Sequence, residues 1–256
     1  MRLYGTSTLS GPLFWLAAVV VSAAPSHAQI AMKGATSEGR VLFHSPALST
    51  NGLSCIDCHA DFDEGRMGDG RIRAGHSLYG AASRQTFWGQ EPGDPFRYMD
   101  ITEAAVTCVK RFMLNPEQLT TEQVLSLGAY LKSINRRPSI APLALSPAPD
   151  RTGVYADFEG GDRIKGRKLF YAACHACHPN GNSGVASALP RDEDPSFYAR
   201  KIREGDGLGL LFAGIDPDAY DEESEMFMPF FGADRLSNEQ IRHIVAYIKS
   251  LPPPTP

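Results

Sequence analysis

Two short clusters of cysteine and histidine carry the most distinctive chemistry in this sequence. They are Cys55-Ile56-Asp57-Cys58-His59 and Cys174-His175-Ala176-Cys177-His178. In both clusters two residues separate the cysteines, and a histidine directly follows the second one. This Cys-x-x-Cys-His spacing lets two thiols add across the vinyl groups of one porphyrin while the histidine reaches its iron. The sequence therefore predicts two covalently bound haem c groups, attached and ligated by Cys55, Cys58, His59, Cys174, Cys177 and His178.

The cysteine count narrows the alternatives. The chain contains five cysteines, and four of them belong to the two motifs. A zinc site and a thioredoxin-like redox pair are the alternatives, and two complete motifs in a chain with so few cysteines favour haem. The remaining cysteine, Cys108, is an odd thiol, which in an exported protein needs an explanation.

Residues 1–28 have the pattern of a secretory signal peptide. Arg2 supplies the positive start, residues 13–21 form an apolar core, and Ser26-His27-Ala28 offers small residues to a signal peptidase. The apolar core is too short to span a membrane comfortably, although an uncleaved anchor is the alternative. Export to the periplasm agrees with haem attachment, which bacteria perform outside the cytoplasmic membrane. The net charge of -4 gives no basis for nucleic-acid binding.

An internal repeat divides the rest of the chain into two similar halves. Gly39-Arg40-Val41-Leu42-Phe43 precedes the first motif, and Gly166-Arg167-Lys168-Leu169-Phe170 precedes the second. After each motif comes an irregular region and then a segment that starts with Thr or Ser and Glu and continues with one apolar stripe. This pattern predicts helices over 119–134 and 236–251. We expect domains at 29–135 and 158–256, joined by a stiff Pro-rich linker at 136–157.

The repeated unit of short helix, haem motif, loops and terminal helix resembles the class I cytochrome c fold. The resemblance implies an all-α protein of two tandem class I cytochrome c domains, each a small helical fold wrapped around one covalent haem. It also implies that the first and last helices of each domain cross through a glycine and two aromatic residues. These contacts would join Gly39 and Phe43 to Tyr130, and Gly166 and Phe170 to Tyr247.

The second motif has a recognisable candidate for the distal ligand of its iron. Met228-Pro229-Phe230 resembles the loop that delivers the distal methionine in class I cytochromes c, and the proline would help to fix that loop. Met226 is the alternative. A histidine–methionine pair raises the reduction potential of haem iron, which suits an electron acceptor or relay. The resemblance also implies that the carbonyl of Pro190 orients His178.

The distal ligand at the first motif is open between Cys108, Met113, His76 and Met99. Chemistry favours Cys108, because iron coordination would explain the unpaired thiol, and Lys110 and Arg111 could stabilise a thiolate. If residues 102–114 form one helix, Cys108 and Met113 lie about 140° apart and should not both face the iron. A separate candidate, Arg84, would bind a haem propionate.

The segment Cys108-Val109-Lys110-Arg111 is similar to the Cys-x-x-Arg of dihaem thiosulfate dehydrogenases. That resemblance implies that Cys108 binds a catalytic haem iron and that Arg111 lies near a sulfur anion.

We expect a periplasmic dihaem cytochrome c that transfers electrons between redox partner proteins, with a membrane-bound electron donor or acceptor as one possible partner. The alternative is an oxidoreductase of the thiosulfate dehydrogenase type, with the first haem as catalytic site and the second as electron exit. A cytochrome subunit of a larger respiratory complex is the third hypothesis. The sequence does not predict an oligomeric state.

Overall fold

The computed structural model describes residues 27–88, 97–216, 218–219 and 228–254. The predicted signal peptide therefore lies outside the described residues except for its last two positions, and Met226 also lies outside them. Within the described part of the chain, no helix combines the length and apolarity that crossing a membrane requires.

Helices dominate the fold, as the all-α prediction requires. In chain order the α-helices are α1 (His27–His44), α2 (Cys55–Cys58), α3 (Ile101–Arg111), α4 (Thr121–Ser133), α5 (Arg163–Ala173), α6 (Pro195–Glu204), α7 (Leu208–Phe212) and α8 (Asn238–Lys249). Three short 3-10 turns are η1 (Pro46–Leu48), η2 (Ala81–Ser83) and η3 (Pro179–Gly181). The strands β1 (Phe87–Trp88) and β2 (Arg97–Tyr98) pair antiparallel, with Phe87 opposite Tyr98.

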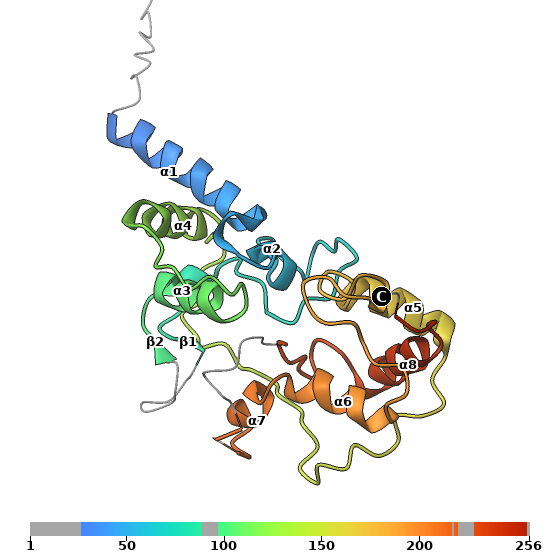
Figure 1. Ribbon diagram of the computed structural model, residues 1–256. Coiled ribbons are helices and arrows are strands. Elements are labelled where there is room, and N and C mark those ends of the chain that lie inside the picture. Colours follow the sequence, from blue (N-terminus) through green and yellow to red (C-terminus); the bar gives the residue numbers. More distant parts are fainter. Residues whose placement is uncertain (1–26, 89–96, 217, 220–227, 255–256) are drawn as a thin grey trace, which may run out of the picture.

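Helices α1 and α4 lie side by side in the first half of the chain (Figure 1). Gly39 makes this approach possible, because a Cβ atom there would overlap the backbone carbonyl of Ser126. One turn later, the rings of Phe43 and Tyr130 lie 5.5 Å apart between centroids, and both side chains are buried. The contacts predicted for Gly39 and Phe43 with Tyr130 are present.

Helices α5 and α8 repeat this arrangement in the second half (Figure 1). A Cβ atom at Gly166 would overlap the backbone carbonyl of His243. The ring centroids of Phe170 and Tyr247 are 5.3 Å apart. The sequence repeat therefore corresponds to two helix pairs that cross in the same way.

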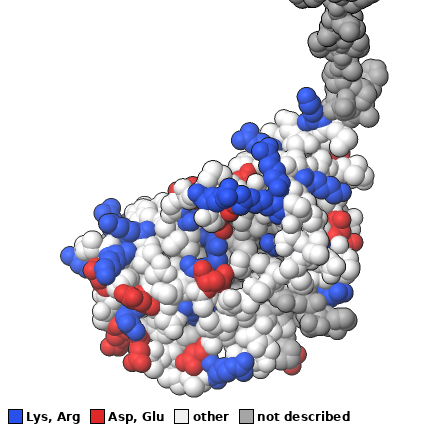
Figure 2. All heavy atoms as spheres, turned by 180° about the vertical axis from the view of Figure 1, so that it is seen from behind, with Lys and Arg blue, Asp and Glu red and all other residues white. Residues whose placement is uncertain are grey.

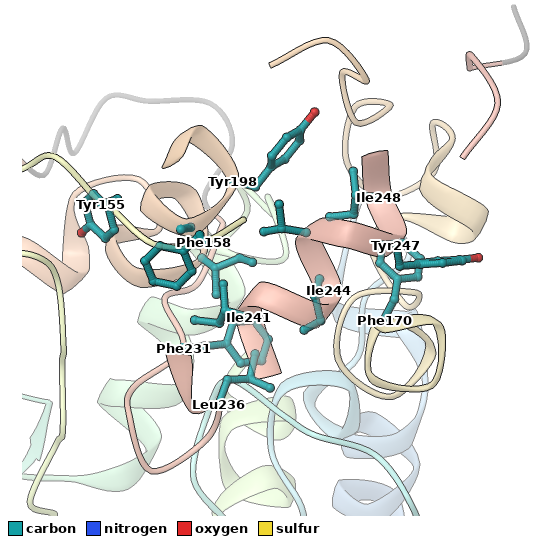
Figure 3. Close-up of a cluster of buried hydrophobic side chains, with 13 residues drawn as sticks. Tyr155, Phe158, Phe170, Tyr198, Phe231, Leu236, Ile241, Ile244, Tyr247 and Ile248 are labelled. Atoms are coloured by element: carbon teal, nitrogen blue, oxygen red, sulfur yellow. The ribbon is translucent and has the colours of Figure 1, made fainter. Parts of the chain in front are cut away.

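Both terminal helices begin with the same cap. The Thr120 side chain accepts a hydrogen bond from the backbone N–H of Gln123, whose side chain accepts one from the N–H of Thr120, and Ser237 and Gln240 do the same before α8. Glutamine rather than the predicted glutamate completes each capping box, because its carbonyl oxygen accepts the backbone hydrogen equally well. The apolar stripe of α8 forms the centre of the largest buried cluster (Figure 3).

The two halves are in direct contact. The backbone N–H of Ile72 donates to the carbonyl of Ala172 at 2.9 Å, and the guanidinium of Arg235 donates to Glu64 at 3.0 Å. Cys177 and Val185 of the second half pack against a buried cluster of the first. Residues 136–157 contain neither helix nor strand, while the domain boundaries on either side of them remain a prediction.

Charges are interspersed on the face of the molecule shown in Figure 2. Basic and acidic side chains alternate there with wide uncharged areas. One pair with a structural role is partly hidden from solvent. The guanidinium of Arg73, whose side chain is 1% exposed, donates to the carboxylate of Asp69 at 2.6 and 3.1 Å and to the carbonyl of Ile56 at 2.8 Å.

This pair predicts an acid-sensitive contribution to stability. The hydrogen bonds from Arg73 lower the pKa of Asp69 from 3.8 to about 2. Because the folded-state pKa is below the unfolded value, the carboxylate stabilises the fold fully above about pH 5 and loses this effect as the pH falls towards 2.

We expect Asp69→Asn to lower the free energy of unfolding by about 1 kcal/mol at pH 7, a value reduced for the partial exposure of the carboxylate. The difference from wild type should shrink as the pH is lowered from 5 to 3. Urea unfolding at several pH values measures it. Equal losses at pH 7 and at pH 3 would contradict the interpretation.

Candidate haem-binding sites

The first motif opens onto an apolar cavity of about 210 Å³, called here the first cavity. Cys55 to Cys58 form α2, and at its N-terminus the backbone N–H and the hydroxyl of Ser54 donate to the carboxylate of Asp57 at 2.9 and 2.7 Å. Both cysteines and His59 line the cavity. The short helix and the residue that follows it therefore bring the three motif side chains to the lining of the same apolar space.

The orientation of His59 is set by a backbone carbonyl. Its Nδ1 lies 2.7 Å from the carbonyl oxygen of His76. Since a carbonyl only accepts hydrogen bonds, Nδ1 carries the proton and Nε2 keeps its lone pair. Burial lowers the pKa of His59, which favours the neutral imidazole that a metal ion requires.

The polar groups in the first cavity fit a ligand that carries carboxylates. Thr86 is buried, lines the cavity, and its hydroxyl has no hydrogen-bond partner. Arg84 lines the same cavity, and burial lowers the pKa of its guanidinium. A buried hydroxyl and a half-buried arginine both gain from an anionic partner. The propionates of a haem would supply one, as predicted for Arg84.

The second motif lines another apolar cavity, of about 340 Å³, called here the second cavity. Cys174, Cys177 and His178 all lie in its wall. The Nδ1 of His178 is 3.1 Å from the carbonyl oxygen of Ser187, and burial lowers the pKa of the imidazole. His178 is therefore prepared in the same way as His59, with Nε2 available to a metal ion.

The prediction for Pro190 is wrong. The carbonyl that orients His178 belongs to Ser187, and the carbonyl of Pro190 instead accepts the hydroxyl hydrogen of Tyr198 at 2.8 Å. The physical reason is local, because the chain after the motif makes a tight turn through η3 that brings Ser187 next to the imidazole. Nothing in the residue types marked Ser187, since a backbone carbonyl is present at every position.

Met228 lies in the wall of the second cavity, together with His178. Its backbone N–H donates to the carboxylate of Asp206 at 2.5 Å. Gly205 ends α6 with φ +61°, and a Cβ atom there would overlap the Met228 carbonyl. Three residues on, the N–H of Phe231 donates to Ile202 at 2.8 Å. The segment that carries Met228 is thus anchored on the C-terminal end of α6.

The structure separates the four distal candidates of the first site. Cys108, Met113 and His76 line the first cavity, whereas Met99 is 61% exposed and is absent from its lining. The carbonyl of His76 lies against His59, and its Nε2 is 2.6 Å from Asp234. His76 therefore sits on the side of the cavity that holds the motif histidine.

Cys108 and Met113 share the cavity, contrary to the expectation for one continuous helix. Helix α3 ends at Arg111, so the helical spacing of 100° per residue does not extend to Met113. The N–H of Met113 bonds back to the carbonyl of Cys108 at 3.3 Å, and this turn brings the methionine round. Met113 is also packed in an apolar cluster, with Leu48 and Leu53 among its members.

The basic residues after Cys108 are not in the cavity. Neither Lys110 nor Arg111 contributes to the lining, and Lys110 is exposed. Lys110 follows Cys108 by two positions, which turns it about 200° around the helix. Burial raises the pKa of the Cys108 thiol to about 12, with a further contribution from Cys55. A metal ion bound to Cys108 would have to lower the pKa of this thiol, a role that the sequence had predicted for Lys110 and Arg111.

The two cavities share a wall. Five residues line both of them: Leu53, Cys58, Ala74, Phe112 and Pro229. Cys58 belongs to the first motif, and Pro229 directly follows Met228 of the second half. The shared wall was not predicted, because its residues are distant in sequence and nothing in their types indicates that they lie together.

All five cysteines are free thiols. None of the five cysteines forms a disulfide. Among the described residues, no three His, Cys, Asp or Glu side chains come together as a group that could hold a metal ion by themselves.

Comparisons with known proteins identify one domain. Residues 164–252 match the family model for cytochrome c, a region that holds the second motif and extends through α8. This region of the chain is therefore similar to a cytochrome c domain, and the similarity supports covalently bound haem c and a role in electron transfer.

No curated protein sequence matches the chain. The structure of thiosulfate dehydrogenase (TsdBA) from Marichromatium purpuratum, in its as-isolated form, is 13% identical with a TM-score of 0.40. The match covers 92% of this chain and 48% of that one, so the chain spans about half the length of that structure. At this similarity the match says nothing about activity.

Proposed function

We propose that this chain is a periplasmic dihaem cytochrome c that transfers electrons between redox partner proteins, with one haem in each cavity. A membrane-bound donor or acceptor fits this location. The observation that carries the proposal is the wall common to the two cavities, each of which contains a complete Cys-x-x-Cys-His motif. Two haems held there would be close enough for an electron to pass directly within one molecule.

The motif residues would attach the two haems and bind their irons. Cys55, Cys58, Cys174 and Cys177 would form the thioether bonds, and His59 and His178 would bind iron through Nε2. Bound haem c supplies reversible one-electron transfer. The walls of both cavities are mostly apolar.

We further propose Met228 as the distal ligand in the second cavity and Cys108 in the first. Methionine opposite histidine raises the potential of the second haem, whereas a thiolate donates electron density to the first. Electrons would then pass from the first haem to the second.

The test counts the haems and measures electron transfer between them. Protein matured with covalent haem should contain two haems per chain by pyridine haemochrome assay and mass spectrometry. The variants Cys55→Ala/Cys58→Ala and Cys174→Ala/Cys177→Ala should each retain one. After rapid one-electron reduction, equilibration between the haems should proceed at a rate independent of protein concentration. A single haem in wild type would refute the proposal.

An oxidoreductase acting on a sulfur anion is the second candidate, favoured by the presence of Cys108 and the half-buried Arg84 in the lining of the first cavity. Addition of thiosulfate to the oxidised dihaem protein separates the two functions. Rapid reduction of the haems with turnover would favour the enzyme, and no reduction is the expected result for an electron carrier.

The ligand role of Cys108 makes a spectroscopic prediction. Ferric wild-type protein should show a narrow low-spin electron paramagnetic resonance signal from thiolate-ligated haem, and Cys108→Met should abolish it. Met113→Leu, a nearby change of similar volume, should leave the signal unchanged. A wild-type spectrum that Cys108→Met does not alter would exclude the thiolate ligand.

A further inference from the structure

Residues 73–76, called here the proximal segment, lie alongside the backbone of the first motif. The N–H of Gly75 donates to the carbonyl of Cys58 at 3.0 Å, and the carbonyl of His76 accepts from His59 at 2.7 Å. A Cβ atom at Gly75 would overlap the His59 imidazole. The proximal segment therefore lies directly against the motif histidine, and a shift of this segment must alter the hydrogen bond at His59 Nδ1.

Residues 228–236 of the second half, called here the ligand loop, hold the proximal segment from the other side. The carboxylate of Asp234 lies 2.6 Å from Nε2 of His76. Arg235 donates through Nε to the carbonyl of Arg73 at 2.7 Å, and its guanidinium makes two hydrogen bonds of 3.0 Å to Glu64. These contacts fix the segment at both ends.

The ligand loop begins at Met228 in the wall of the second cavity, yet further along it becomes part of the first. Pro229, Phe230, Gly232 and Asp234 line the first cavity. Met228 and Asp234 are six residues apart in one loop, which is anchored at both ends by hydrogen bonds to α6 and to the proximal segment. The ligand loop thus carries Met228, the predicted distal ligand of the second site. It also contacts His76, whose carbonyl orients His59 of the first site.

We propose that Asp234 and Arg235 are positioning residues that couple the two haem sites. They hold the His76 carbonyl against His59, so the position of the ligand loop sets the redox potential of the first haem. The inference rests on the proposed dihaem function. A strong acceptor at Nδ1–H makes the imidazole a better donor to iron, which stabilises the ferric state. Loss of the Asp234 contact should weaken that hydrogen bond and raise the potential of the first haem.

Coupling of this kind is reciprocal. Displacement of Met228 from the second iron should change the potential of the first haem, and the change should depend on Asp234. Neither effect requires contact between Asp234 and a haem.

The test uses the holoprotein with both haems counted in every variant. Spectroelectrochemical titration should show that Asp234→Ala raises the potential of the first haem and leaves the second haem with its methionine ligand. Asp234→Asn should restore most of the wild-type value, because an amide oxygen still accepts from His76. His44→Ala is the matched control, since His44 and Asp61 form a pair of 2.8 Å that lines neither cavity.

A double-mutant cycle tests the coupling itself. The shift of the first potential caused by Met228→Ala should be smaller in the Asp234→Ala background than in wild type. An unchanged first potential in Asp234→Ala, an equal shift in Asp234→Asn, or additive effects in the cycle would each overturn the inference. Fewer than two haems in wild type would instead refute the proposed function.

Discussion

Replacement of Met228 with alanine is expected to lower the midpoint potential of the second haem by on the order of 0.1 V or more, within the roughly 0.8 V that axial ligands span. A thioether sulfur favours ferrous iron, so its loss favours the ferric state. The ferric protein should also lose the long-wavelength absorption of methionine-ligated haem. Redox titration followed in the visible spectrum measures both effects.

The structural basis is the anchoring of the segment around Met228. The hydrogen bond to Asp206 and the close approach to Gly205 hold the backbone of Met228 in the lining of the cavity that also contains His178. Proline at the next position restricts the chain further. A methionine that is held in place loses less entropy when its sulfur binds the iron.

Met226→Ala is the matched control, because Met226 is the alternative ligand only two residues away. It should leave the potential and the long-wavelength band unchanged. If the two variants exchange their effects, Met226 rather than Met228 is the ligand. A wild-type potential in both variants would mean that neither methionine binds the iron.

Replacement of Gly166 with alanine is the second prediction with a large effect, on stability. The added Cβ would overlap the His243 carbonyl, a backbone group that cannot rotate out of the way. Helices α5 and α8 would have to separate, which also disturbs the packing of Phe170 on Tyr247. We expect a loss of about 3 kcal/mol in the free energy of unfolding, at the upper end of typical overpacking costs.

Gly34→Ala provides the control. Gly34 lies in α1, and a Cβ atom there meets no other atom within 4 Å. Since alanine favours the helix by about 1 kcal/mol over glycine, this variant should be neutral or slightly more stable. Urea unfolding followed by circular dichroism compares the two. Equal stability of Gly166→Ala and wild type would show that the helices do not cross as closely as described.

Local sequence patterns determined the helical architecture. The apolar stripes and the caps at Thr120 and Ser237 predicted the two terminal helices, because helix starts and helix faces depend on residue types within one or two turns. The same holds for the haem motifs, whose chemistry depends on spacing along the chain. The crossing of these helices with the segments around Gly39 and Gly166 was implied by the resemblance to class I cytochrome c. The cytochrome c match over 164–252 agrees with that interpretation for the second half.

Only the tertiary structure decided how the parts meet. It showed that Ser187 rather than Pro190 orients His178, that Met99 is outside the first cavity, and that the ligand loop reaches across to His76. These results depend on backbone carbonyls and on contacts between residues up to 158 positions apart, which leave no signature in residue type or spacing. The chemistry of the two motifs was therefore encoded locally, whereas the proximity of the two cavities arises only from the packing of the halves against each other.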